Sequence, residues 1–304
     1  MSNSLNTRNF FIQKLKGETA RAIQELIDLC HEEPYLLRLL QSSKLKCVYT
    51  ASYNTNLVGI FIAWRSEFHP HCTYFRILIP PLYHQLNVEK YLLNKVEKLE
   101  DFKLPLQTSI WETATHLRAF YEGNGFTEIR RTYMPLLDVQ TTKPIFPTNE
   151  SHNTLYNLQT LSEIISKDTL MKKLAQLVKT NYEKTHLANP VATYNLETWR
   201  EMILVNDLIA DGSFLFLNEQ EEIIAYSFLH TSEKNNTLEL GWCGTNTIQN
   251  LHLLQQLVIK QITYANKHGY SFLQGEFDST SGYGIEILKS CPFQPCPTWI
   301  TYQK

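Results

Sequence analysis

The chain has 304 residues, of which 43% are hydrophobic, and this content is enough for one large domain or two ordinary ones. Its formal net charge of −2 gives no clustered positive charge, so neither nucleic acid nor an anionic membrane is an expected partner. No apolar run approaches the length of a membrane span, and the first residues lack the apolar core of a signal peptide, so we expect a cytoplasmic protein.

The cysteines and histidines give no sign of a metal centre. The six cysteines are scattered and lack the close pairs of zinc sites. Cys291 and Cys296 stand five residues apart, where a disulfide or metal pair is one interpretation and two unrelated thiols the favoured one. His69, His71 and Cys72 have no second cluster to complete a ligand set, so we expect no metal.

The hydrophobic pattern of the first half predicts strands and helices in alternation. Apolar residues recur at helical spacing in 17–33 and 87–102, and β-branched and aromatic residues crowd the segments between them. The turn at 54–56 between two such segments predicts a hairpin. The expected strands are 9–15, 46–54, 56–64, 72–79, 106–112 and 128–137, and a further helix covers the stretch from 116.

The second half repeats this order. The segments 56–64, 105–112 and 123–126 correspond to 222–230, 272–279 and 290–293, at an offset of 166 or 167 residues. Three anchors in one order and register indicate a duplicated domain. Residues 140–153 contain two prolines and a polar tail, which is typical of a linker. We therefore expect domains at 1–139 and 154–304, joined by a linker at 140–153.

The element order, together with residues 117–137, resembles the GNAT superfamily of N-acetyltransferases, and the duplication resembles its tandem members. The family's FYE-x-x-GF sequence is matched by Phe120, Tyr121, Glu122, Gly125 and Phe126. The resemblance implies an α/β fold, also classed as α+β, of two tandem domains, each with a central mixed sheet flanked by helices. It implies a sheet that opens between its fourth and fifth strands, where acetyl-CoA lies, and acetylation of a small-molecule or peptide amine.

The resemblance also implies catalytic roles. Acetyl transfer to an amine requires a base for the amine proton and an acid for the departing thiolate. Tyr121 stands at the family's acid position, and Glu112, at the end of the fifth strand, is the candidate base of the first half. In the second copy Leu288 replaces the tyrosine, but Glu239 lies in the fourth strand, where some members keep their base. Two alternatives stay open: an active cleft in the second half with Glu239, or a degenerate binding or interaction module.

We expect acetyl-CoA to bind in the first half of the chain rather than in the second. By resemblance, the strand residues Ile77 and Ile79 and the loop residues His84, Gln85, Leu86, Asn87 and Val88 would contact it. The family's pyrophosphate loop carries glycines, and this chain has none there. Asn87 is a partial substitute because asparagine tolerates positive φ. Glu89, in contrast, would place a negative charge against the pyrophosphate.

Overall fold

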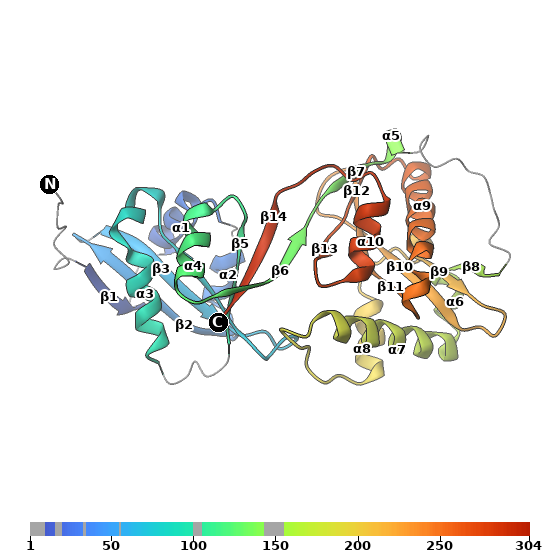
Figure 1. The fold of residues 1–304 in the computed structure, drawn as a ribbon, viewed down its shortest axis with the longest axis horizontal. Coiled ribbons are helices and arrows are strands. Elements are labelled where there is room, and N and C mark those ends of the chain that lie inside the picture. Colours follow the sequence, from blue (N-terminus) through green and yellow to red (C-terminus); the bar gives the residue numbers. More distant parts are fainter. Residues whose placement is uncertain (1–9, 16–19, 33–34, 55, 100–104, 143–154) are drawn as a thin grey trace.

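The computed structural model describes residues 10–15, 20–32, 35–54, 56–99, 105–142 and 155–304. Within these ranges the chain forms two mixed β-sheets flanked by helices, which confirms the predicted fold class (Figure 1). Most of the linker predicted at 140–153 lies outside the described residues, and its first three belong to the short helix α5 (Val139–Thr142).

The first sheet has eight strands in the order β1-β2-β3-β4-β5-β14-β6-β13. The strands are β1 (Phe10–Lys14), β2 (Leu45–Tyr53), β3 (Asn56–Trp64), β4 (Thr73–Leu78), β5 (Leu106–Trp111), β6 (Thr127–Tyr133), β13 (Phe277–Asp278) and β14 (Thr298–Gln303). The helices around it are α1 (Ala20–Leu29), α2 (Tyr35–Leu40), the 3-10 turn η2 (Pro81–Leu86), α3 (Val88–Glu97) and α4 (Thr115–Gly123).

The second sheet has six strands in the order β7-β12-β11-β10-β9-β8. The strands are β7 (Leu136–Asp138), β8 (Asn157–Thr160), β9 (Phe214–Leu217), β10 (Ile223–Thr231), β11 (Thr237–Thr245) and β12 (Phe272–Gln274). The helices around it are α6 (Leu161–Ile164), α7 (Asp168–Thr185), α8 (Leu196–Ile203), α9 (His252–Lys267) and α10 (Gly282–Ser290), with the 3-10 turns η3 (Ala210–Gly212) and η4 (Ile248–Asn250).

Strand alternation divides each sheet between two cores. In β2 to β4, odd-numbered residues such as Phe61 and Phe75 pack against α3 and α4, whereas even-numbered residues such as Ile60 and Leu78 pack against α1 and α2. The second sheet is covered in the same way, by α9 and α10 on one face and by α7 and α8 on the other. Both faces of each sheet are therefore buried, which explains why the strands read as nearly continuous apolar runs.

The two sheets exchange strands. The last strand of the chain, β14, lies between β5 and β6 of the first sheet, with Ile300 opposite Ile110 on one side and Arg131 on the other. In return β7, which follows β6 directly, pairs with β12 of the second sheet, where Leu137 lies opposite Leu273. The predicted domain limits stay a prediction, but hydrogen bonding crosses them in both directions.

Both sheets open between their fourth and fifth strands. The parallel strands β4 and β5 pair only at Thr73 with Leu106 and at Tyr74 with Gln107, although β4 continues to Leu78. Likewise β11 and β12 pair from Thr237 to Glu239, and β11 then continues to Thr245 without that partner. The divergence expected from the resemblance is thus present twice.

The exchanged strand gives a stability test. Ile300 is fully buried in the core of the first sheet, so Ile300→Ala should lower the free energy of unfolding by about 2–5 kcal/mol. Amide exchange should then become faster in β5 and β6, the strands that β14 joins. Phe11→Ala, at a side chain that is 62% exposed in β1, is the control and should change stability by about 0.5 kcal/mol at most. Unchanged exchange in β5 and β6 would contradict this placement of β14.

Candidate active site

A β-bulge marks the point where β11 leaves β12. Between β10 and β11, Ser227 lies opposite Cys243 and Leu229 opposite Leu240, so β11 has one residue more than its partner over this stretch. The extra residue falls at Gly241 and Trp242. Bulges of this kind redirect backbone groups and are frequent beside active sites. At position 241 an added Cβ would meet the imidazole of His230, which would then have to shift.

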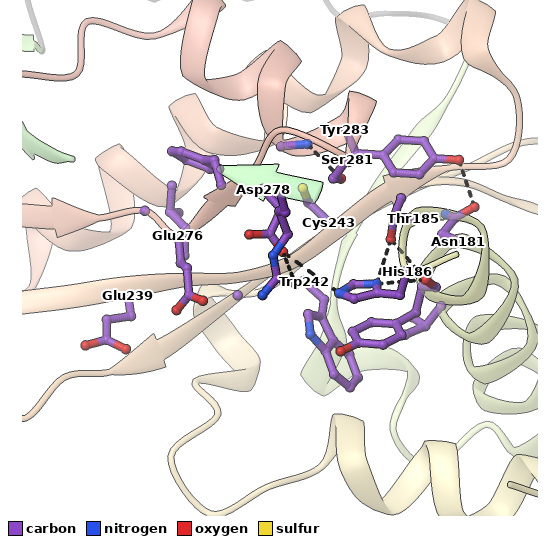
Figure 2. A pocket seen from close by; sticks show the side chains of 18 of the residues that line it. Asn181, Thr185, His186, Glu239, Trp242, Cys243, Glu276, Asp278, Ser281 and Tyr283 are labelled. Atoms are coloured by element: carbon purple, nitrogen blue, oxygen red, sulfur yellow. Dashed lines mark hydrogen bonds and ion pairs between the residues drawn. The ribbon is translucent and has the colours of Figure 1, made fainter. Parts of the chain in front are cut away.

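The acidic cavity, as we name it, opens beside this bulge. It has a volume of about 500 Å³ and lies where β11 and β12 diverge. Figure 2 shows Glu239, Glu276 and Asp278 on the side formed by β11 to β13, and Asn181 and His186 on the side formed by α7. Residues of the first sheet and its loops complete the lining, namely His69, Tyr74, Gln107, Ser109 and Arg130.

The three carboxylates differ in their partners. Asp278 accepts a hydrogen bond from the Thr132 hydroxyl at 2.5 Å and lies 3.2 Å from Nη1 of Arg130. Glu239 accepts a hydrogen bond from the Ser232 hydroxyl at 2.6 Å. Glu276 has no hydrogen bond or ion pair within the part of the chain that the structure describes. It is the carboxylate of the three that is available to a ligand on both oxygens.

The surroundings of Glu276 favour its protonated form. Its side chain is accessible from the cavity, yet the protein walls around it raise the pKa of its carboxyl above the usual value. The neighbouring charges of Asp278 and Glu239 raise this pKa further, and Arg130 opposes them. A carboxyl group with a raised pKa in a cleft is a common feature of general bases and acids.

Aromatic rings form the wall on the side of α7. Tyr182 stacks on His186 at 3.9 Å between ring centroids and packs against Trp242 at 5.3 Å. His69, from the loop before β4, donates from Nδ1 to the carbonyl oxygen of Asn189 at 2.8 Å and accepts from the Tyr182 hydroxyl at Nε2, 2.9 Å away. Burial lowers the pKa of His69, which agrees with this neutral tautomer.

A second phenol reaches the cavity from α10. The Tyr283 hydroxyl donates to Oδ1 of Asn181 at 2.9 Å, and the Asn181 amide donates in turn to the carbonyl oxygen of Thr245 at the end of β11 (Figure 2). Burial raises the pKa of Tyr283, so the phenol carries its proton. Tyr283 stands about one turn before the position of Tyr121 in the repeat, but the fold brings it to the opened strands.

The two predicted catalytic residues of the first half lie apart from the cavities described here. Tyr121 is 1% exposed and packs among Phe75, Phe126 and Tyr302, and this burial raises the pKa of its phenol. Glu112 accepts a hydrogen bond from the backbone N–H of Thr298 at 3.0 Å, at the start of β14. Their catalytic roles stay predictions.

The predicted cofactor residues separate into two groups. Ile77, Ile79 and His84 line a cavity of about 310 Å³ between the end of β4 and the start of α4, which we name the β4 cavity. Gln85, Leu86, Asn87 and Val88 are outside its lining: Val88 is buried in the core, Leu86 packs against it, and Gln85 and Asn87 face solvent. Asn87 has φ 53°, the left-handed conformation expected of a glycine substitute. Glu89 is buried, 2.5 Å from Nε2 of His116.

An arginine crosses the opening of the first sheet. Arg76 of β4 is 4% exposed and donates to Oγ1 of Thr108 at 3.3 Å and to the carbonyl oxygen of Ser109, both on β5. Its guanidinium also lies 4.9 Å from the centre of the Trp299 ring. A buried arginine therefore bridges the gap between β4 and β5, beside a cavity of about 330 Å³ that Arg76, Thr108 and Trp299 line.

Sequence reasoning missed several of these residues. Glu276 corresponds to Ser109 in the repeat, so the first half offered no counterpart, although its place just after the fifth strand was a usable signal. Gly241 carried no signal without the register of β10.

In the described part of the chain, no group of three or more His, Cys, Asp or Glu side chains is suited to a metal ion, and no helix is long and apolar enough to cross a membrane.

Comparisons with known proteins agree with this fold. No protein-family model matches the sequence, and no match to it is found among curated proteins. Among solved structures, a GCN5-related N-acetyltransferase from Sphaerobacter thermophilus aligns with a TM-score of 0.62 at 14% identity, over 99% of this chain and 96% of that one. A tandem GNAT protein from the clavulanic acid biosynthesis pathway aligns with 0.60 at 12%, over 97% and 98%.

A further similar structure is the glucosamine N-acetyltransferase region of a fungal multi-domain β-N-acetylglucosaminidase, with a TM-score of 0.67 at 10% identity. That alignment covers 100% of this chain and 39% of the other. At such low identities the likeness concerns the arrangement of the backbone, and two of these alignments span both halves of proteins of similar length. The chain therefore has the fold of the tandem GNAT N-acetyltransferases.

Proposed function

We propose that the protein is an N-acetyltransferase that transfers the acetyl group of acetyl-CoA to an amine bound in the acidic cavity. The observation that carries this proposal is the bulge of β11 at Gly241 and Trp242, which faces a cavity of about 500 Å³ at the opening of the sheet. The fold shared with proteins named N-acetyltransferases supports the reaction type. The choice between the two halves rests on the cavities themselves.

Glu276 is the proposed general base. An alkylammonium must lose a proton before its nitrogen can attack a carbonyl carbon, and a carboxylate in reach can accept it. Because the pKa of Glu276 is raised, its carboxylate holds a proton more strongly than an ordinary glutamate does. Neither of its oxygens has a hydrogen-bond partner among the described residues, whereas Asp278 and Glu239 accept hydrogen bonds from Thr132 and Ser232.

The open edge of β11 is suited to the developing oxyanion. Beyond Glu239 this edge has no pairing with β12, so backbone N–H groups next to the bulge can face the cavity. Fixed backbone donors of this kind stabilise the charge that forms on a carbonyl oxygen during acyl transfer. Acetyl-CoA supplies the acetyl group as a reactive thioester.

Tyr283 is the proposed proton donor for the departing thiolate. Its phenol keeps its proton because burial raises its pKa, and Asn181 fixes its direction. The pyrophosphate of acetyl-CoA would lie at the first turn of α9, a helix of sixteen residues whose leading N–H groups lack partners within the helix. No glycine is needed for those groups to donate, although close approach of the backbone is harder without one.

The alternative places the reaction in the first half, with Tyr121 and Glu112 as the catalytic pair. The gathering of Ile77, Ile79 and His84 around the β4 cavity favours acetyl-CoA binding there. Two observations argue against chemistry at that place. Arg76 bridges the strands where a thioester would have to pass, and Glu112 is engaged with the start of β14.

Replacing the proposed base should separate the alternatives. Glu276→Gln should lower kcat for amine acetylation about 10²–10⁴-fold, because the amide cannot accept the ammonium proton, and should leave acetyl-CoA affinity unchanged. Glu219→Gln, at an exposed carboxylate away from the cavity, is the matched control. A loss of turnover in Tyr121→Phe with full activity in Glu276→Gln would instead place the site in the first half.

The position of acetyl-CoA can be measured on the full chain. The halves should not be separated for this purpose, because β14 completes the first sheet. Amide exchange with and without acetyl-CoA should show protection in residues 240–253 and in α10. Protection confined to residues 77–88 would favour the β4 cavity, and no protection anywhere would favour a binding module for other ligands.

The raised pKa of Glu276 also predicts a pH effect on stability. The folded chain binds this proton more tightly than the unfolded chain, so stability falls as the pH rises from the ordinary value of 4.5 through the folded pKa. Glu276→Gln removes this effect. Its Tm should exceed that of the unchanged protein at about pH 8 and converge with it at about pH 4. The same Tm difference at both pH values would show that the carboxyl is unperturbed.

A further inference from the structure

The lining of the acidic cavity is strongly unbalanced in charge. Four carboxylates line it, Asp207, Glu239, Glu276 and Asp278, against one guanidinium, that of Arg130. Burial lowers the pKa of the His69 and His186 imidazoles, and the third lining histidine, His230, lies 3.5 Å from Asp207. Arg130 is already paired with Asp278 at 3.2 Å. The remaining carboxylates have no lysine or arginine partner in the described part of the chain.

Two of these carboxylates come from neighbouring strands, close to the point where the strands diverge. Glu239 on β11 is paired in register with Gln274 on β12, and Glu276 follows two residues later. At about 3.3 Å per strand residue this separates the two backbone positions by roughly 7–8 Å, along and across the strands. Figure 2 shows both side chains on the same side of the cavity. Glu239 holds the Ser232 hydroxyl on one oxygen, which leaves the other for a ligand.

A buried acceptor in the wall of the cavity has no donor among the described residues. Asn189 is 9% exposed and lines the cavity, and its side-chain oxygen Oδ1 has no hydrogen-bond partner within the described residues. Its amide nitrogen donates to the Tyr74 hydroxyl at 2.7 Å, which fixes the side chain in place. An unsatisfied buried acceptor is costly and calls for a donor. The rings of Tyr182 and Trp242 nearby are further surfaces that attract cations.

We propose that the acetyl acceptor is a small linear amine with a second positive charge, such as an alkyl diamine. This proposal rests on the proposed function. Glu276 accepts the proton of one ammonium, and the freed amine nitrogen forms the N–C bond while the C–S bond of the thioester breaks. The electron pair leaves on sulfur, which takes a proton from Tyr283. The attacking nitrogen, positively charged once the N–C bond has formed, gives its second proton to the Tyr283 oxygen, so the products are a neutral amide and the thiol of CoA. Glu239 pairs with the second ammonium, which stays protonated and holds the chain of the acceptor in place.

Calorimetric titration of the full chain, without acetyl-CoA, tests this directly. The probes are 1,4-diaminobutane, 1-aminobutane and 4-aminobutanoate, which have the same chain length and differ in the charge at the far end. The diamine should bind at least about tenfold more tightly than the monoamine, as one charged hydrogen bond implies. The aminobutanoate should bind most weakly, and added salt should weaken the diamine most.

The Glu239→Gln variant locates the second charge. It should reduce affinity for the diamine about tenfold and leave that for the monoamine unchanged. Glu219→Gln should change neither, and an unchanged circular dichroism spectrum will show that Glu239→Gln is folded. Equal affinities for diamine and monoamine, or an unaltered diamine affinity in Glu239→Gln, would overturn the proposal.

Acetylation assays with the same amines distinguish this proposal from the proposed function. Turnover of monoamines with no preference for diamines would reject the diamine and retain the acetyltransferase. Tight diamine binding without acetylation of any amine would reject the acetyltransferase and retain the cation site. Faster acetylation of the diamine, with the preference abolished in Glu239→Gln, is the result expected if both are correct.

Discussion

The pairing of β14 with both β5 and β6 is the interaction on which the rest of the structure depends. These antiparallel pairs place the last strand of the chain inside the first sheet, and the return strand β7 fixes the start of the second. The two sheets therefore cannot move independently without breaking ladder hydrogen bonds. The contact of β13 with β6, with Asp278 held by Arg130 and Thr132, lies at the same seam. A cavity with walls from both halves can be a fixed site only because of this connection.

The two sheets open in the same way, but different residues occupy the two openings. Each fifth strand pairs with its fourth for two or three residues, and the fourth strand then continues alone. In the first sheet the exposed edge is bridged by Arg76, which donates to the neighbouring strand. In the second sheet the extra residue of β11 and the glycine at 241 leave the edge free. The same backbone arrangement thus holds a buried arginine in one copy and borders the acidic cavity in the other.

The sequence predicted the elements and their duplication because these depend on local periodicity. The repeat anchors Gln107 and Gln274 each stand in the last pair before the sheet opens, so the alignment located the equivalent points. The exchange of strands was not predictable. The apolar pattern of β14 indicates that this strand is buried, but it does not indicate which strands lie next to it. Glu276 was missed for a related reason: its direction depends on Gly275 and on the end of a three-residue strand.

The difference between Glu239 and Glu276 shows how neighbours can divide roles between similar side chains. Glu239 sits within β11, is paired across the sheet with His230, and accepts a hydrogen bond from the Ser232 hydroxyl, which fixes the direction of its carboxylate. Glu276 lies just beyond a strand end with no such donor, and burial favours its protonated form. A group that must accept and release a proton benefits from the second environment, and a group that must hold a cation benefits from the first. The carboxylate suggested by the fourth strand is therefore better suited to binding, and the one beyond the fifth to catalysis.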